Sequence, residues 1–145
     1  MPQQPIIVDT NVIFSTLLRD QSGFADTLLR TDHHFFACEL VLVELFKHKE
    51  RIVQASHLSE DEIVRFYYNL LRRISVYRED LIAPKNWQEA YILCRDVDES
   101  DTPHVALALE LDGLLWTGDR ALRDGLRRKG FDRFFEPGAK DSSGS

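Results

Sequence analysis

Four acidic residues in separate segments of the chain are the side chains best suited to chemistry: Asp9, Glu44, Asp101 and Asp119. Asp9 ends the apolar run IIV, and Asp119 follows LLWTG. Asp101 opens the stretch DTPHVALALEL, and Glu44 interrupts the apolar ELVLVELF. Carboxylates that converge repel one another, so they need protons, cationic partners or metal ions. The four acids are therefore the main guide to function.

The donor type decides which ion the four acids would prefer. Ligands that are all oxygen suit Mg²⁺ or Mn²⁺, whereas zinc prefers His and Cys. Mg²⁺ takes one or two carboxylates, keeps several waters and leaves room for a substrate phosphate. Such an ion lowers the pKa of a bound water and neutralises charge that develops on the phosphate. The histidines offer no rival site: no HExxH is present, and we expect His104 to be an ordinary helix-surface residue.

Taken singly, three of the acids have a structural explanation. Asp101 precedes a helix and would serve as its N-cap, and Asp98 has the same ambiguity. Glu44 falls between the apolar and polar faces of its helix, and its competitor Glu39 lies in the probable first turn. Asp119 follows a turn-like Thr-Gly pair. These separate roles do not explain why all four acids are present in one small α/β domain.

Short apolar runs alternate with helical segments, which predicts one α/β domain with a mainly parallel sheet of four to five strands. Ser59 and Glu62 match a capping box that begins a helix. We expect the domain to span 1–138, with a flexible tail at 139–145. The expected strands are 6–8, 35–37, 74–77 and 114–116, with a possible edge strand at 131–135. Further helices are expected after 8, at 26–30, over 38–57 with one break, and after 59, 84, 102 and 119.

The acids can meet because ligands of open α/β sheets bind beyond the carboxyl ends of the strands. Asp9 and Asp119 each directly follow a predicted strand end, so both should face that crevice. Asp101 lies at a helix start, where the helix dipole favours an anion.

Composition limits the class of protein. The chain has 145 residues, 43% hydrophobic and 29% charged, as expected for a single globular domain. It has no apolar run long enough to span a membrane, and Cys38 and Cys94 match no disulfide framework, so we expect a cytoplasmic protein. The net charge is −6, yet basic residues gather near 47–51, 72–73 and 120–129, where a local patch could still bind an anion.

Four segments in order resemble the motifs of PIN-domain nucleases. IIVDTNVIFSTL resembles the opening motif, and VLVEL resembles the motif that carries a glutamate. DESDTPHVALALELDGLLWTGDRAL resembles the last two motifs together. Order and spacing agree over about residues 5–125. The resemblance implies a three-layer α/β/α sandwich and a Mg²⁺- or Mn²⁺-dependent ribonuclease, of the kind that includes the VapC-type toxins of toxin–antitoxin pairs.

The resemblance also assigns roles to residues. It implies that Asp9, Glu44, Asp101 and Asp119 hold the metal, with Asp98 as either a rival to Asp101 or an additional ligand. Asn11, Ser15 and Thr117 match supporting positions that orient the acids. We expect basic residues to hold the RNA backbone, namely Lys47, Arg51, Arg120 and Arg123. An antitoxin protein and a homodimer are the possible protein partners.

Two alternatives remain. The chain could be a PIN-like RNA- or protein-binding module without activity, although the presence of all four acids counts against this. An aspartyl-phosphate phosphatase also places an Asp after its first strand. That chemistry usually requires a second acid two positions on, where this chain has Asn11.

Overall fold

The protein is described by a computed structural model that covers residues 4–18, 32–56 and 58–136, with the side chains of 15–18 excluded. The predicted helix at 26–30 and the predicted tail at 139–145 lie outside these residues. The elements in chain order are β1 (Ile6–Val8), α1 (Thr10–Leu18), β2 (Phe35–Cys38), α3 (Glu39–Lys47), α4 (Lys49–Ala55), α5 (Glu60–Arg73), β3 (Ile74–Tyr77), η1 (Glu79–Leu81), α6 (Pro84–Cys94), η2 (Glu99–Asp101), α7 (Thr102–Leu111), β4 (Leu114–Trp116) and α8 (Arg120–Arg128).

The four strands form one sheet in the order β3-β2-β1-β4, and every pairing is parallel. The chain runs outward from β1 to β2 and β3, and β4 is then added on the other side of β1. The order of the strands therefore reverses between β1 and β4. At such a point the connections leave in opposite directions and open a crevice at the carboxyl ends of the strands.

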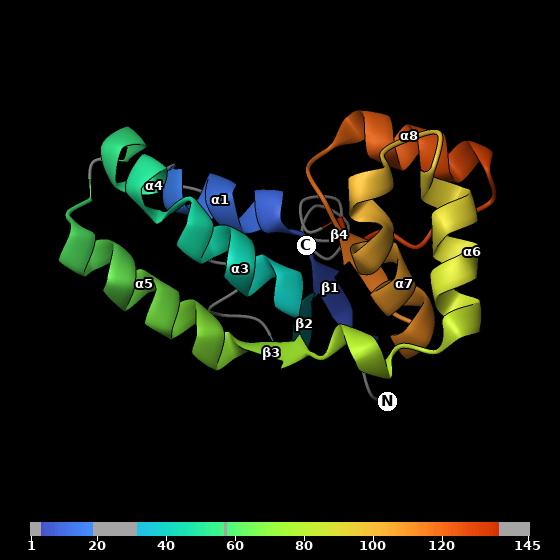
Figure 1. Ribbon diagram of the computed structural model, residues 1–145, viewed down its shortest axis with the longest axis horizontal. Coiled ribbons are helices and arrows are strands. Elements are labelled where there is room, and N and C mark those ends of the chain that lie inside the picture. Colours follow the sequence, from blue (N-terminus) through green and yellow to red (C-terminus); the bar gives the residue numbers. More distant parts are fainter. Residues whose placement is uncertain (1–3, 19–31, 57, 137–145) are drawn as a thin grey trace, which may run out of the picture.

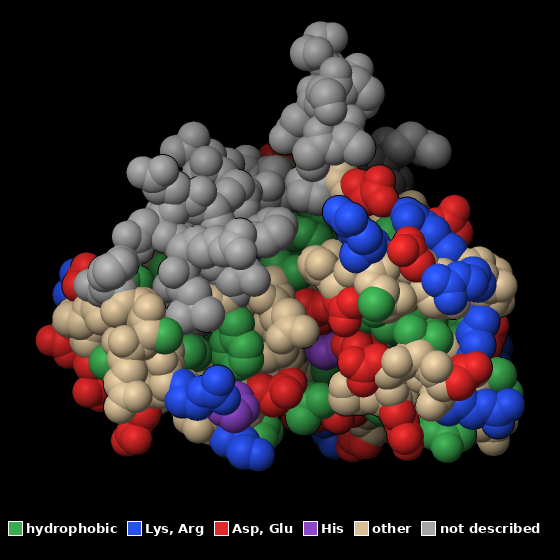
Figure 2. Space-filling model, turned by 90° about the horizontal axis from the view of Figure 1, so that it is seen from above, with side chains coloured by type: hydrophobic (Ala, Val, Ile, Leu, Met, Phe, Trp, Pro, Cys, Tyr) green, Lys and Arg blue, Asp and Glu red, His purple; other side chains and the backbone are tan. Residues whose placement is uncertain are grey.

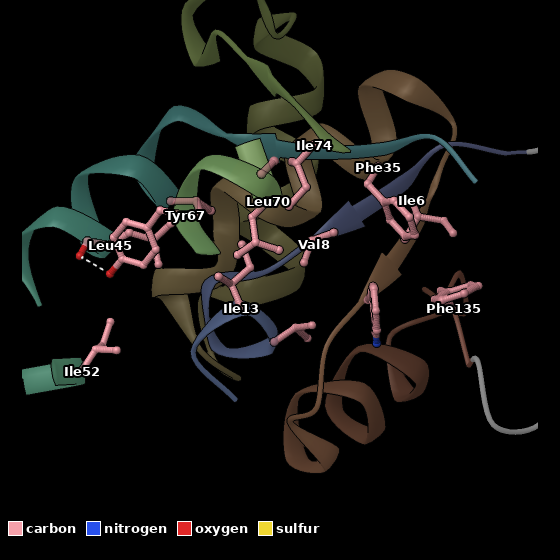
Figure 3. Packing of buried hydrophobic residues seen from close by; sticks show 14 of the residues in the cluster. Ile6, Val8, Ile13, Phe35, Leu45, Ile52, Tyr67, Leu70, Ile74 and Phe135 are labelled. Carbon is pink, nitrogen blue, oxygen red and sulfur yellow. Dashed lines mark hydrogen bonds between the residues drawn. The ribbon is translucent and has the colours of Figure 1, made fainter. Parts of the chain in front are cut away.

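Helices cover both faces of the sheet, as the alternation of side chains along the strands requires (Figure 1). Ile6 and Val8 point into one cluster with residues of α1, α3, α4 and α5, part of which is drawn in Figure 3. Ile7 points into a second cluster with residues of α6, α7 and α8. The predicted three-layer α/β/α arrangement is confirmed. No helix in the described segments is long and apolar enough to cross a membrane.

Local sequence signals explain several boundaries. The Ser59 hydroxyl accepts from the Glu62 amide at 3.2 Å, and the Glu62 carboxylate accepts from the Ser59 amide at 2.9 Å, so the predicted capping box begins α5. The predicted break in 38–57 falls at His48, between α3 and α4.

The possible fifth strand at 131–135 does not form in the structure. Only an isolated parallel bridge joins Leu115 to Phe134, with the Leu115 amide and carbonyl bonded to Arg133 and Phe135. Phe131 and Phe135 are instead buried, in opposite clusters. The segment closes the edge of β4 mainly through its side chains, so the sheet has four strands.

Gly113 allows the backbone before β4 to lie against the start of β1. A Cβ at this position would lie 2.6 Å from the Pro5 carbonyl oxygen and 2.7 Å from Ile7 Cδ1. We expect Gly113→Ala to lower the free energy of unfolding by about 2 kcal/mol, because the clash is with backbone that cannot move away freely. Urea denaturation measures this. Gly118→Ala is the matched control, since a Cβ there meets nothing within 4 Å; equal losses in the two variants would contradict the explanation.

Candidate metal centre

The reversal of strand order brings the DTN segment after β1 and the TGD segment after β4 together at the carboxyl edge of the sheet. Val8 pairs with Trp116, so Asp9 and Thr117 are the next residues on adjacent parallel strands. The Asp9 amide donates to the Trp116 carbonyl at 3.2 Å, which fixes the two segments side by side. The crevice predicted from the sequence is therefore bordered by Asp9 and by the Thr117–Asp119 turn.

Asp9 is the most buried of the acids, with 2% of its surface exposed. Its Oδ1 accepts from the Val12 amide at 2.9 Å, which caps the start of α1. Its Oδ2 is buried and has no hydrogen-bond partner among the residues that the structure describes. Burial raises the pKa of Asp9 from 3.8 to about 6, and the charge of Asp119 adds to this rise. The Thr117 hydroxyl and nearby amides oppose the rise without giving Oδ2 a partner of hydrogen-bond geometry.

Asp119 repeats the same arrangement at the end of β4. Its Oδ1 accepts from the Leu122 amide at 3.0 Å and caps α8. The Thr117 hydroxyl accepts from the Asp119 amide at 3.1 Å, so Thr117 fixes the turn between strand and helix. Thr117 is buried and near both Asp9 and Asp119, in keeping with the supporting role predicted for it. Asp9 and Asp119 thus each use one carboxylate oxygen for the fold, which leaves the other for the crevice.

Asp98 and Asp101 have different environments. The Asp98 carboxylate is exposed and accepts from both the amide and the hydroxyl of Ser100, at 3.1 and 2.6 Å, and these bonds lower its pKa. Asp101 stands at the N-cap position of α7, yet its side chain makes no capping bond. Burial raises the pKa of Asp101 to about 7, and the charges of Asp9, Asp98 and Asp119 contribute. Asp98 caps η2, whereas the Asp101 carboxylate caps neither η2 nor α7, so capping does not account for Asp101.

Glu44 approaches the crevice from α3 and is held by a hydroxyl. Thr10, the residue after Asp9, donates to Glu44 Oε1 at 2.7 Å. This contact connects the VLVEL segment, which carries Glu44, to the DTN segment, which carries Asp9. Glu44 is half-buried, at the boundary of core and surface as its helix position predicts. The rival Glu39 is exposed and accepts from the Glu79 amide at 3.3 Å, beside the connection after β3.

His104 is buried, with 3% of its surface exposed, and the expectation of a surface histidine is wrong. The reason is that α7 has apolar neighbours on nearly every side, between the sheet and α6 (Figure 1). Burial lowers the pKa of His104 to about 4, opposed by the nearby negative charge of Glu44. His104 is therefore neutral near pH 7, and its Nδ1 has no hydrogen-bond partner within the described segments.

Thr10 and His104 were not identified as site residues from the sequence. Thr10 follows Asp9 in the motif DTN, at the start of a predicted helix. A hydroxyl residue next to an acid at this place could have been identified from the sequence as a hydrogen-bond donor to a second acid. His104 lies three residues after Asp101, which places the two on one side of a helix. The structure adds both to the surroundings of Glu44.

The remaining predicted residues lie around the crevice. Asn11 is exposed in the first turn of α1, and the side chain of Ser15 lies outside the description. The four predicted RNA-binding residues form no ion pair with any residue that the structure describes: Lys47, Arg51, Arg120 and Arg123. Other basic side chains are occupied, such as Lys49 with Glu60 at 2.8 Å and Arg127 with Asp132 at 2.7 Å. Figure 2 shows acidic side chains near the middle of one face, with basic ones toward the α8 end.

Among the described residues, no three His, Cys, Asp or Glu side chains are already arranged to hold one ion. The acids are nevertheless close enough for Asp9 and Asp119 to raise the pKa of Asp101. A buried carboxylate oxygen without a donor and two carboxyls with raised pKa are what a cation would relieve. The oxygen-only donor set fits Mg²⁺ or Mn²⁺. We take the residues to fit a divalent ion, with Glu44 connected to Asp9 through the hydroxyl of the adjacent Thr10.

Comparison with known proteins agrees with this geometry. A family model described as "PIN domain" matches residues 7–134. The chain therefore belongs to the PIN-domain family. Among solved structures, a chain in the crystal structure of VapBC2 from Rickettsia felis, bound to a DNA fragment from their promoter, is similar with a TM-score of 0.65 and 14% identity. The match covers 91% of this chain and 97% of that chain, and at this identity it shows a shared fold. No curated protein sequence matches the chain.

Proposed function

We propose that this PIN domain is a divalent-metal-dependent ribonuclease that hydrolyses RNA phosphodiesters. The observation that carries the proposal is the buried Oδ2 of Asp9, which has no hydrogen-bond partner in the described part of the chain. The charge of Asp119 raises the pKa of Asp9, and the charges of Asp9 and Asp119 raise the pKa of Asp101. A purely structural carboxylate would have donors for both oxygens, because a buried polar group without a partner costs stability. The family resemblance of the motifs supports the same reading.

The roles of the chain's residues follow from their contacts. Asp9, Asp101 and Asp119 would hold the ion, because each has a carboxylate oxygen that the fold does not use. Thr117 orients Asp119 through its amide. Thr10 fixes Glu44, which would act from the opposite side. When bound, a divalent ion stabilises charge that develops on the phosphate and favours ionisation of water.

The basic residues would hold the substrate. Lys47 and Arg51 lie on the Glu44 side of the crevice, and Arg120 and Arg123 follow Asp119 on α8. Because none of these four is engaged in an ion pair within the described segments, their charges are available to the RNA backbone. Binding of this kind weakens as salt rises, since it releases counterions from the nucleic acid. The net charge of −6 does not oppose it, because the local patch governs contact.

We further propose that the protein is the toxin of a type II toxin–antitoxin pair. The motifs resemble VapC-type toxins, and the similar solved structure is of a VapBC2 complex. A small antitoxin protein would then block the acidic crevice, and a homodimer would add a second basic surface. Copurification of a small partner with the protein tests this part of the proposal.

The ribonuclease proposal is tested by incubating the purified protein with tRNA, rRNA and mRNA, in Mg²⁺ or Mn²⁺ and in EDTA. We expect cleavage of at least one RNA class with metal and none in EDTA. Cleavage that persists in EDTA would contradict the proposal, as would intact RNA in every class with either metal. Intact RNA together with metal binding would favour the inactive binding module.

The two neighbouring acids should differ in their contribution to activity. We expect Asp101→Asn to lower the cleavage rate about 100-fold or more, because it removes a carboxylate that holds the ion. Asp98→Asn should cost less than about tenfold, because Asp98 is exposed and its hydrogen bonds to Ser100 survive in part. Steady-state rates on one RNA measure both. A larger loss in Asp98→Asn than in Asp101→Asn would reverse the assignment.

A further inference from the structure

A pocket of about 300 Å³ lies beside the acidic crevice, between α1 and α4. Its described lining consists of Asn11, Phe14, His48, Arg51, Ile52 and Ala55. The lining combines two aromatic rings, one cation, one amide and two aliphatic side chains, those of Ile52 and Ala55. Ligand sites of proteins are typically of this kind, mainly apolar with a few polar groups, and this volume is near the lower end of their range.

Two residues of the lining, Asn11 and His48, connect the pocket to residues of the candidate metal centre. Asn11 follows Thr10, whose hydroxyl donates to Glu44. His48 lies one helical turn after Glu44, and its amide donates to the Glu44 carbonyl at 3.1 Å. The side chains at these i and i+4 positions share one face of the helix. A group that occupies the pocket therefore contacts Asn11, which follows Thr10 in the chain, and His48, which lies one turn after Glu44.

The chemistry of the lining suits a nucleobase. The rings of Phe14 and His48 meet edge to face, with centroids 6.0 Å apart and planes at 80°. Single-stranded RNA is recognised by bases that leave the stack and lie on aromatic rings or on an arginine. Arg51 is exposed and has no ion pair with a described residue, so its donors can reach a base edge or the adjoining phosphate.

We propose that this pocket binds a base of the RNA substrate next to the scissile phosphate, with Phe14, His48 and Arg51 as its specificity-determining residues. The proposal rests on the ribonuclease function above and adds the position at which a nucleotide is read. The base lies against the two aromatic rings, and Asn11 offers an amide donor and acceptor to its edge. The phosphate of that nucleotide is then directed toward Glu44 and the acidic cluster.

The test is an NMR titration of the whole protein in EDTA with the four nucleoside 5′-monophosphates, read on the His48 ring proton. His48→Gln assigns that signal among the five histidines. We expect at least one nucleotide to shift it in a saturable way. Phe14→Leu and Arg51→Gln should each weaken that binding about fivefold or more, as loss of stacking or of a charged donor does. Arg95→Gln, on the exposed end of α6, is the matched control and should bind as the wild type does.

Three results would overturn the proposal. One is no response to any of the four nucleotides, as expected of a pocket that takes a protein side chain instead. Another is binding that Phe14→Leu and Arg51→Gln leave unchanged. The third is ribose 5-phosphate binding as tightly as the nucleotides, which would reduce the pocket to a phosphate site. Because EDTA removes the metal and no cleavage is needed, failure here is separate from failure of the ribonuclease assay.

Discussion

Replacement of Asp9 by asparagine is expected to lower Mg²⁺-dependent RNA cleavage at least about 100-fold while making the metal-free protein more stable. Activity falls because the buried Oδ2 is the atom best placed to hold the ion, and such an ion contributes several kcal/mol to the reaction. Stability rises because an amide retains an acceptor for the Val12 amide without the cost of a buried charge.

The size of the stability change follows from the pKa of Asp9. Its folded value of about 6 lies above the ordinary 3.8, so its favourable contribution is present below pH 3.8 and is lost as the pH rises through 6. Above that pH the ionised group opposes folding by about 3 kcal/mol, which corresponds to a melting temperature roughly 10 °C lower. Thermal melts in EDTA near pH 8 measure the gain in Asp9→Asn.

Asp124→Asn is the matched control for Asp9→Asn, because Asp124 is an exposed aspartate on α8. It should change neither the cleavage rate nor the melting temperature appreciably. Wild-type cleavage by Asp9→Asn would show that Asp9 holds no ion that the reaction needs. A lower melting temperature for Asp9→Asn in EDTA would show that its charge is compensated in the fold.

The stability of the metal-free protein should fall as the pH rises from about 4 to about 7, and Mg²⁺ should restore much of the loss. Asp9 and Asp101 have folded pKa values of about 6 and about 7, both above their unfolded values. Ionisation in this range therefore costs folding free energy. A cation that binds only the folded, ionised cluster stabilises it by mass action.

His104 acts in the opposite direction at lower pH. Its folded pKa of about 4 lies below the ordinary 6.5, so stability is lost as the pH falls from 6.5 toward 4. Between about pH 4 and 6.5 His104 therefore offsets one of the two aspartates, so the melting temperature should fall less steeply there than the two aspartates alone would make it fall. Circular dichroism melts over this pH series, in EDTA and in Mg²⁺, give the measurement. Asp101→Asn should make the decline between about pH 4 and 7 shallower, and a wild-type profile that rises steadily to pH 8 in EDTA would show that Asp9 and Asp101 do not lower the stability on ionisation.

Much of the fold followed from local patterns. The apolar runs that became β1 and β4 are short and continuous, as strands buried on both faces are. Ser59 and Glu62 set the start of α5 through contacts that depend only on neighbours in sequence. The segment at 131–135 was less predictable, because the burial of Phe131 and Phe135 on opposite faces is decided by tertiary packing.

In the candidate site too, some residues could be placed from local sequence patterns and others depended on tertiary structure. Asp9 and Asp119 could be placed because each follows a strand at the edge where parallel sheets bind ligands. The proposed preference for Asp101 over Asp98 rests on which carboxylate caps the short helix η2, a hydrogen-bond arrangement that the spacing DESD leaves open. The burial of His104 required knowing that α7 is packed on nearly all sides.

Calorimetric titration of Mn²⁺ into the metal-free protein near pH 8 tests the central claim, that these acids form one divalent-metal centre. We predict saturable binding by the wild type, binding lost or weakened at least about tenfold in Asp9→Asn and in Asp101→Asn, and unchanged binding in Asp124→Asn. No binding by the wild type, or equal affinities in all four proteins, would contradict the claim.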